Sequence, residues 1–170
     1  STSTFYKTGN SNGTLSLKIS GNGYNDVTTI AFDAQATNQF DVDKDANKLP
    51  GRLVQPMIAS KVGNDKYSIN TLESISTNPT VDVEFMAGTN GNFTITADDL
   101  STFDPTVMVY LEDKIVHGAW KDLRQSNTYS FNGNVADSKD RFVLHFTPAA
   151  YVNTEDAECD KGGVITMEQE

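Results

Sequence analysis

The sequence predicts an all-β protein: a two-sheet antiparallel β-sandwich, jelly-roll-like in topology, with about nine strands. Short segments in which apolar and polar residues alternate recur along the 170-residue chain. This period of two is typical of strands that bury one face. Turns rich in Gly, Asn and Asp separate the segments, and no long segment has the apolar repeat of an amphipathic helix. Two packed sheets let every strand bury its apolar face.

In the first half of the chain, the clearest strand is the one in which Leu15, Leu17 and Ile19 alternate with polar residues. A second strand, at residues 27–32, leads through a polar segment into an acidic loop. The same kind of pattern predicts further strands at residues 54–62, 67–72, 81–85 and 93–97.

The second half continues with a short helical turn at residues 98–103 and then strands at 107–111, 129–131 and 142–146. Residues 115–124 are expected to form a hairpin tip. We therefore expect one β-sandwich module over residues 1–148. Residues 149–158 are small and acidic, a loop follows at 159–163, and residues 149–170 as a whole do not continue the alternation and are typical of a linker and the start of a following module or tail.

Composition and charge limit the classes of partner. Lys and Arg total 13 against 23 Asp and Glu, a formal net charge of -10. This balance repels nucleic acid and anionic lipid surfaces. No apolar run is long enough to span a membrane, so membrane insertion is not expected. The single cysteine, Cys159, excludes an internal disulfide and a cysteine-based metal site.

The acidic loop at residues 40–49 is the strongest candidate for a metal site. Side chains with oxygen ligands stand at every second position, at Asp41, Asp43, Asp45 and Asn47. Such oxygen ligands suit a hard cation, so the sequence predicts calcium as the cofactor. The loop is not an EF-hand, because Ala46 and Arg52 replace the required Gly and Glu. The alternative is a solvated acidic turn without a metal ion.

Trp120 is the candidate ligand-binding residue, since it is the only tryptophan and lies in an expected exposed hairpin. Aromatic side chains on such surfaces can stack on sugar rings. The alternative interpretation is that Trp120 folds back over the edge of the sandwich and covers core residues.

Catalysis is not expected. Asp82 and Glu84 lie two apart on one predicted strand, on what we expect to be its solvent face, and form the best carboxylate pair. However, the Glu-x-Asp-x-x-Glu pattern of sandwich-fold glycosidases is absent. His117 and His145 belong to no metal-ligand or nucleophile motif and are expected to be ordinary surface residues.

Seven segments resemble, in this order, a β-sandwich module of large secreted or surface proteins of Bacteroidetes that are exported by the type IX secretion system. They are I-A-F-D at 30–33, A-T-N-Q-F-D at 36–41, D-A-N-K-L at 45–49, Y-S-I-N-T-L at 67–72, G-N-F-T-I at 91–95, V-Y-L-E-D-K at 109–114 and R-F-V-L-H-F at 141–146. In such proteins the module often lies upstream of a sorting domain or of adhesin-like modules.

The resemblance implies an extracellular or cell-surface location and a non-catalytic module, and it implies no defined ligand. In the acidic loop, Asp41, Asp45, Lys48 and Leu49 match the family pattern, whereas Asp43 is particular to this chain. The match also allows a purely structural loop, in which Asp45 bonds backbone amides and Leu49 fills the core.

The function expected from the sequence is therefore that of a non-catalytic module that acts in adhesion, or as a spacer that stabilises neighbouring modules of the same polypeptide. The alternative is a carbohydrate-binding module of a secreted polysaccharide-degrading enzyme, with a surface glycan or polysaccharide as partner. A third alternative is a catalytic domain that uses Asp82 and Glu84.

Overall fold

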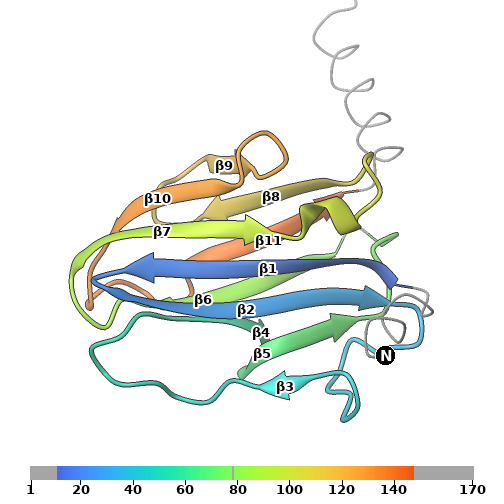
Figure 1. Cartoon of the computed structure of the whole chain (residues 1–170), viewed down its shortest axis with the longest axis horizontal. Coiled ribbons are helices and arrows are strands. Elements are labelled where there is room, and N and C mark those ends of the chain that lie inside the picture. Colours follow the sequence, from blue (N-terminus) through green and yellow to red (C-terminus); the bar gives the residue numbers. More distant parts are fainter. Residues whose placement is uncertain (1–10, 78, 148–170) are drawn as a thin grey trace, which may run out of the picture.

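The computed structural model describes residues 11–77 and 79–147, which form eleven strands and one turn of 3₁₀ helix (Figure 1). The strands are β1 (Ser11–Gly21), β2 (Tyr24–Asp33), β3 (Ala46–Asn47), β4 (Met57–Val62), β5 (Asp65–Leu72), β6 (Thr80–Met86), β7 (Gly91–Asp98), β8 (Met108–Asp113), β9 (Ala119–Asp122), β10 (Thr128–Gly133) and β11 (Phe142–Thr147). The 3₁₀ turn, η1 (Leu100–Thr102), lies between β7 and β8. The all-β class predicted from the sequence is confirmed.

One hydrogen-bonded path, in the order β10-β7-β1-β2-β5-β4-β6-β11-β8-β9, connects ten of the described strands, and β3 pairs with β5. The sheet is mixed, because β2 and β5 are parallel while the other pairs are antiparallel. It curls until it nearly closes into a barrel, so that β7, β1 and β2 lie in front of β6 and β11 (Figure 1). The two-sheet antiparallel sandwich of about nine strands is not confirmed. Alternation shows which side chains are buried but not which strands pair.

The core confirms the alternation on which the strands were predicted. Leu15, Leu17 and Ile19 are fully buried. At one end of the barrel four phenylalanines from different strands form an aromatic cluster: Phe85 of β6 packs against Phe93, Phe131 and Phe142 with ring centroids 5.1–6.2 Å apart. These contacts hold the β7–β10 end of the path against β6 and β11.

A buried ion-pair cluster reinforces this closure between β10 and β8. Arg141 donates from Nε and Nη2 to the two carboxylate oxygens of Asp113, both at 2.9 Å. The Tyr129 hydroxyl of β10 donates to the same carboxylate at 2.8 Å, and Arg141 Nη1 donates to the Asn132 carbonyl at 3.1 Å. The guanidinium also lies 4.4 Å from the centre of the Phe131 ring. Every charged group of the cluster thus has a partner.

The pKa values of the cluster follow from these contacts. Burial opposes ionisation of Asp113, but hydrogen bonds from Arg141 and Tyr129 outweigh it and hold the pKa of this carboxyl below its ordinary value. Burial, together with the Asp113 carboxylate, raises the pKa of Tyr129 to about 12. The cluster is therefore an ion pair with a neutral tyrosine at neutral pH.

The sheet also has an opening between β5 and β6, in addition to the gap between β10 and β8 that the cluster closes. Strand β5 pairs with β4 only at residues 65–67 and then pairs in parallel with β2 at residues 69–72. Strand β4 ends at Val62, whereas β6 begins at Thr80 and pairs with β4 from Asp82 onward. Residues from the end of β5, the start of β6 and the end of β4 line this opening.

Two further expectations from the sequence concern residues 115–124 and residues 149–170. The predicted hairpin tip at residues 115–124 contains the short strand β9, which pairs with β8. The predicted linker at residues 149–170 lies outside the described residues. None of the described segments is a helix long and apolar enough to span a membrane.

Candidate functional site

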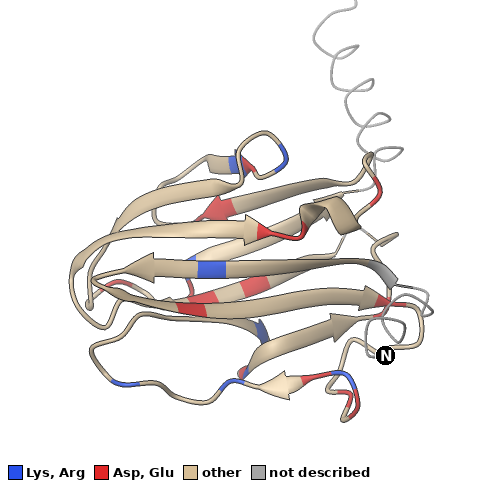
Figure 2. Cartoon of the chain, viewed as in Figure 1, with Lys and Arg blue, Asp and Glu red and all other residues tan. Residues whose placement is uncertain are grey.

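The acidic loop is fastened to the sheet by the carboxylate of Asp45. Its Oδ2 accepts a hydrogen bond from the Asp41 backbone N–H at 2.7 Å, and its Oδ1 accepts one from the Thr71 N–H of β5 at 2.6 Å. Asp41 in turn accepts from the Thr37 N–H at 2.6 Å. Figure 2 shows acidic and basic residues side by side in this loop, where Lys44 pairs with Asp33. Asp45 thus has the structural role that the resemblance implied.

Of the four predicted calcium ligands, Asp41 and Asp45 are in contact, but through the Asp41 backbone N–H and not through its carboxylate. Asp43 and Asn47 are exposed, and their side chains form no hydrogen bond with the other two. Within residues 11–77 and 79–147, no group of three or more His, Cys, Asp or Glu side chains is arranged to hold a metal ion. Calcium binding by Asp41, Asp43, Asp45 and Asn47 stays a prediction.

The prediction that Leu49 fills the core is wrong, because its side chain is 79% exposed. The inward position belongs to Lys48. Its Nζ donates to Asp26 Oδ1 at 2.7 Å and to the Val27 carbonyl at 2.8 Å. Since successive residues of an extended segment point to opposite sides, the inward Lys48 directs Leu49 to the solvent.

Trp120 lies on the outer face of β9 and is 52% exposed. Its ring stacks on the His145 ring with centroids 3.9 Å apart and planes 22° apart. Tyr110 of β8 lies beside it, with ring centroids 6.1 Å apart. We call Tyr110, Trp120 and His145 the aromatic platform. Because His145 covers one face of the indole, Trp120 presents the opposite face to solvent and does not cover core residues.

Carboxylates border the aromatic platform. His145 Nε2 lies 2.8 Å from Glu112 Oε1, a hydrogen bond that fixes the orientation of the imidazole beneath Trp120. In the β8–β9 register, Glu112 is opposite Trp120 and Asp122 is opposite Tyr110. The expectation that His145 is an ordinary surface residue is too simple, since it supports the platform. Alternation placed His145 on the outer face, but only the pairing of β8, β9 and β11 shows that Trp120 is its neighbour.

The carboxylate pair Asp82 and Glu84 is not a solvent-facing pair. Asp82 is exposed, but Glu84 is only 4% exposed. Lys66 Nζ lies 2.7 Å from Glu84 Oε2 in an ion pair that is not an aligned hydrogen bond, and Lys61 Nζ lies 3.9 Å from Oε1. Two lysines from the β4–β5 hairpin cover this carboxylate, which strand alternation alone does not show. His117 is exposed in the turn before β9.

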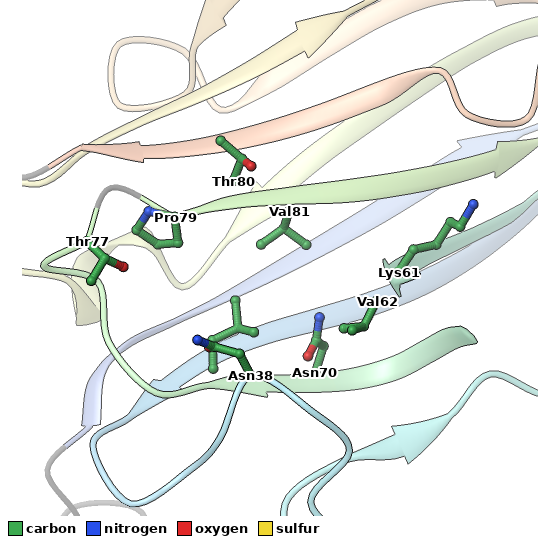
Figure 3. A pocket seen from close by; sticks show the side chains of 9 residues that line it. Asn38, Lys61, Val62, Asn70, Thr77, Pro79, Thr80 and Val81 are labelled. Carbon is green, nitrogen blue, oxygen red and sulfur yellow. The ribbon is translucent and has the colours of Figure 1, made fainter. Parts of the chain in front are cut away.

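A pocket of about 300 Å³ occupies the opening between β5 and β6 (Figure 3). One of the residues that line it is Asn70, which the sequence assigned only to a strand. This residue is 2% exposed, and within the part of the chain that the structure describes its Nδ2 has no hydrogen-bond partner. No sequence signal marks it, because Asn70 stands in an ordinary strand pattern.

Comparison with protein families gives one match. The family described as a domain of unknown function (DUF8693) matches residues 1–146. A search of curated proteins and a search of solved structures gave no match. The match does not bear on type IX secretion or Bacteroidetes, which stay predictions. Since the matched residues make up most of the chain, this protein belongs to the DUF8693 family.

Proposed function

We propose that this domain is a non-catalytic binding module whose aromatic platform holds the ring of a neutral sugar on Trp120. The observation that carries the proposal is the indole itself: one face is stacked on His145 at 3.9 Å and the side chain is about half exposed. A flat apolar surface that is already fixed in position loses little conformational entropy when a ligand covers it.

The surroundings of Trp120 suit a sugar better than an apolar peptide. Sugar rings combine an apolar face of C–H groups, which packs on an aromatic ring, with hydroxyls at the rim. Glu112 and Asp122 lie beside the platform on the same face of the sheet and can accept hydrogen bonds from hydroxyls. The net charge of -10 disfavours acidic glycans, so a neutral glycan fits best.

In the wider setting that we propose, the domain is an extracellular or cell-surface module of a larger polypeptide, and glycan binding is its contribution to adhesion or to substrate targeting. The spacer role, which needs no ligand, is the competing function. The two functions differ in whether Trp120 contacts a ligand.

Trp120 provides its own reporter, because it is the only tryptophan of the chain. We expect its fluorescence to change on titration with at least one of cellotriose, maltotriose, xylotriose, mannotriose and triacetylchitotriose. Trp120→Ala should weaken binding, measured by calorimetry, about tenfold or more, which corresponds to about 1.4 kcal/mol.

The matched control is Tyr24→Ala, which removes an exposed aromatic side chain at the β1–β2 turn, on strands that do not pair with β8, β9 or β11. This variant should bind as the wild type does. A wild-type protein that binds none of these glycans, or a Trp120→Ala variant with unchanged affinity, would reject the proposal and leave the spacer role.

A further inference from the structure

The pocket between β5 and β6 has the features of a built site (Figure 3). Asn70 projects from β5 into it, and its amide nitrogen points toward the space between the two strands. The side chain is 2% exposed, yet Nδ2 donates no hydrogen bond to any described residue. Buried amide groups in proteins almost always have a partner. A ligand with an acceptor oxygen would supply the one that Asn70 lacks.

Apart from Lys61, the described residues that line the pocket are uncharged. The lining combines amide and hydroxyl groups with aliphatic walls and consists of Asn38, Lys61, Val62, Asn70, Leu72, Thr77, Pro79, Thr80 and Val81. Lys61 contributes only its aliphatic stem, because its Nζ is held by Asp140 at 2.7 Å and points away from the pocket in Figure 3. No acidic residue is among the described residues that line the pocket. A neutral ligand with several hydroxyl or carbonyl oxygens matches this chemistry.

The size of the pocket excludes some occupants. A single water takes up about 30 Å³ of liquid, so one water bonded to Asn70 would leave most of the 300 Å³ unfilled. The volume is at the lower end of the range for small-molecule pockets, which suits a group as large as one sugar ring.

The pocket lies directly beside the aromatic platform. Thr80, at its rim, is opposite His145 in the β6–β11 register. His145 is opposite Tyr110, and Tyr110 is opposite Asp122. Directly opposite residues of antiparallel strands project to the same face. The row from Asp122 to Thr80 crosses three strand spacings, about 14 Å in all, so one elongated ligand can reach from the platform into the pocket.

We propose that the β5–β6 pocket is a subsite for one sugar of the same neutral glycan that stacks on Trp120, with Asn70 Nδ2 donating a hydrogen bond to a hydroxyl or carbonyl oxygen of that sugar. This inference rests on the proposed function.

The test uses Asn70→Leu, which removes the amide but keeps a side chain of similar size. In calorimetry with the trisaccharide that binds the wild-type protein, Asn70→Leu should lower affinity about tenfold or more. Asn25→Leu, an exposed position at the start of β2, should leave affinity unchanged. Thermal unfolding of both variants shows whether each is folded at the temperature of the titration.

Nuclear magnetic resonance gives a second measurement that does not depend on a variant. In a ¹⁵N-labelled sample, the trisaccharide should shift the side-chain amide signals of Asn70 and the indole N–H signal of Trp120 together. If Trp120→Ala weakens binding while Asn70→Leu does not, the pocket inference is overturned and the proposed function stands. If the wild-type protein binds none of the trisaccharides, both are overturned.

Discussion

The molecule has two places where its curled sheet is not continuous, and they are filled in opposite ways. Between β10 and β8 the opening is closed by the ion-pair cluster of Arg141, Asp113 and Tyr129, in which every charged group is bonded. Between β5 and β6 the opening holds a pocket and the amide of Asn70, whose Nδ2 has no hydrogen-bond partner among the described residues. The two buried polar sites therefore differ in whether described residues of the protein provide their hydrogen-bond partners.

The difference separates a structural role from a binding role. A buried polar group without a partner costs about 1–3 kcal/mol, and more if it is charged. The cluster avoids this cost through hydrogen bonds within the protein, so its residues hold the barrel closed. Asn70 leaves the cost in place, which is the expected state of a group that a ligand satisfies.

The largest effect is expected at the cluster. Arg141→Met leaves the Asp113 carboxylate buried without its cation and should lower the free energy of unfolding by about 3–5 kcal/mol, as measured by urea denaturation. Arg52→Met is the matched control, because Arg52 is exposed, and it should change stability by less than about 0.5 kcal/mol. A loss below about 1 kcal/mol for Arg141→Met would show that the cluster does not hold the barrel closed.

The pH dependence of stability should reveal the same cluster. Because the pKa of Asp113 is lower in the folded protein than its ordinary value of 3.8, the unfolded chain binds the proton more readily. The stabilisation is thus fully present above the ordinary pKa and is lost as pH falls through the lower folded pKa. Between pH 5 and pH 3.5, the urea midpoint of the wild-type protein should therefore fall more than the urea midpoint of Asp113→Asn. Equal losses in the two proteins would contradict this assignment.

The sequence predicted the all-β class and most strands because burial alternates along them. Leu15, Leu17 and Ile19 are buried as expected. It could not predict the single curled sheet or the parallel β2–β5 pair, because strand pairing depends on contacts between distant segments. The two-residue strand β3 is too short to show a period.

The candidate sites, like the fold, could be predicted from the sequence only in part. Trp120 could be singled out from the sequence as an exposed aromatic residue, whereas its support by His145 depends on the pairing of β8 with β9 and β11. Asn70 could not be singled out at all. Its Nδ2 has no partner among the described residues at a point where β5 has already separated from β4, since the β4–β5 pairing stops at Tyr67, and this is a property of the assembled sheet.

A smaller effect on stability is expected in the acidic loop, where, as in the cluster, a carboxylate accepts hydrogen bonds from other parts of the protein. Asp45→Ala removes acceptors from two backbone N–H groups, those of Asp41 and Thr71, and should cost about 2 kcal/mol in urea denaturation. Asp43→Ala is the control and should cost less than about 0.5 kcal/mol, because this residue is exposed. Similar losses for the two variants would show that Asp45 does not fasten the loop.

The same variants decide the calcium prediction. A bound ion stabilises the folded state by mass action, so a site formed by Asp41, Asp43, Asp45 and Asn47 requires the wild-type melting temperature to rise in millimolar calcium relative to chelator. Asp43→Ala should abolish that rise while the fold stays intact. Equal melting temperatures of the wild-type protein with calcium and with chelator would reject the site.

The smallest effect on stability is expected at the pocket. Whether the substitution stabilises or destabilises the protein shows whether the Asn70 amide has a partner within it. Asn70→Leu replaces an unpartnered buried amide by an apolar group and should leave the ligand-free protein unchanged or more stable by up to about 1 kcal/mol. Thr28→Val is the matched comparison. Thr28 is also fully buried, but its hydroxyl donates to the Tyr67 carbonyl at 2.9 Å and accepts from the Ser60 N–H at 3.1 Å. This substitution should cost about 1–3 kcal/mol, because it removes the acceptor of the Ser60 N–H and leaves the Tyr67 carbonyl with only the 3.4 Å hydrogen bond from Ser60 Oγ. If urea denaturation shows Asn70→Leu to be as destabilising as Thr28→Val, the amide has a partner within the protein, and the contrast between the two openings fails.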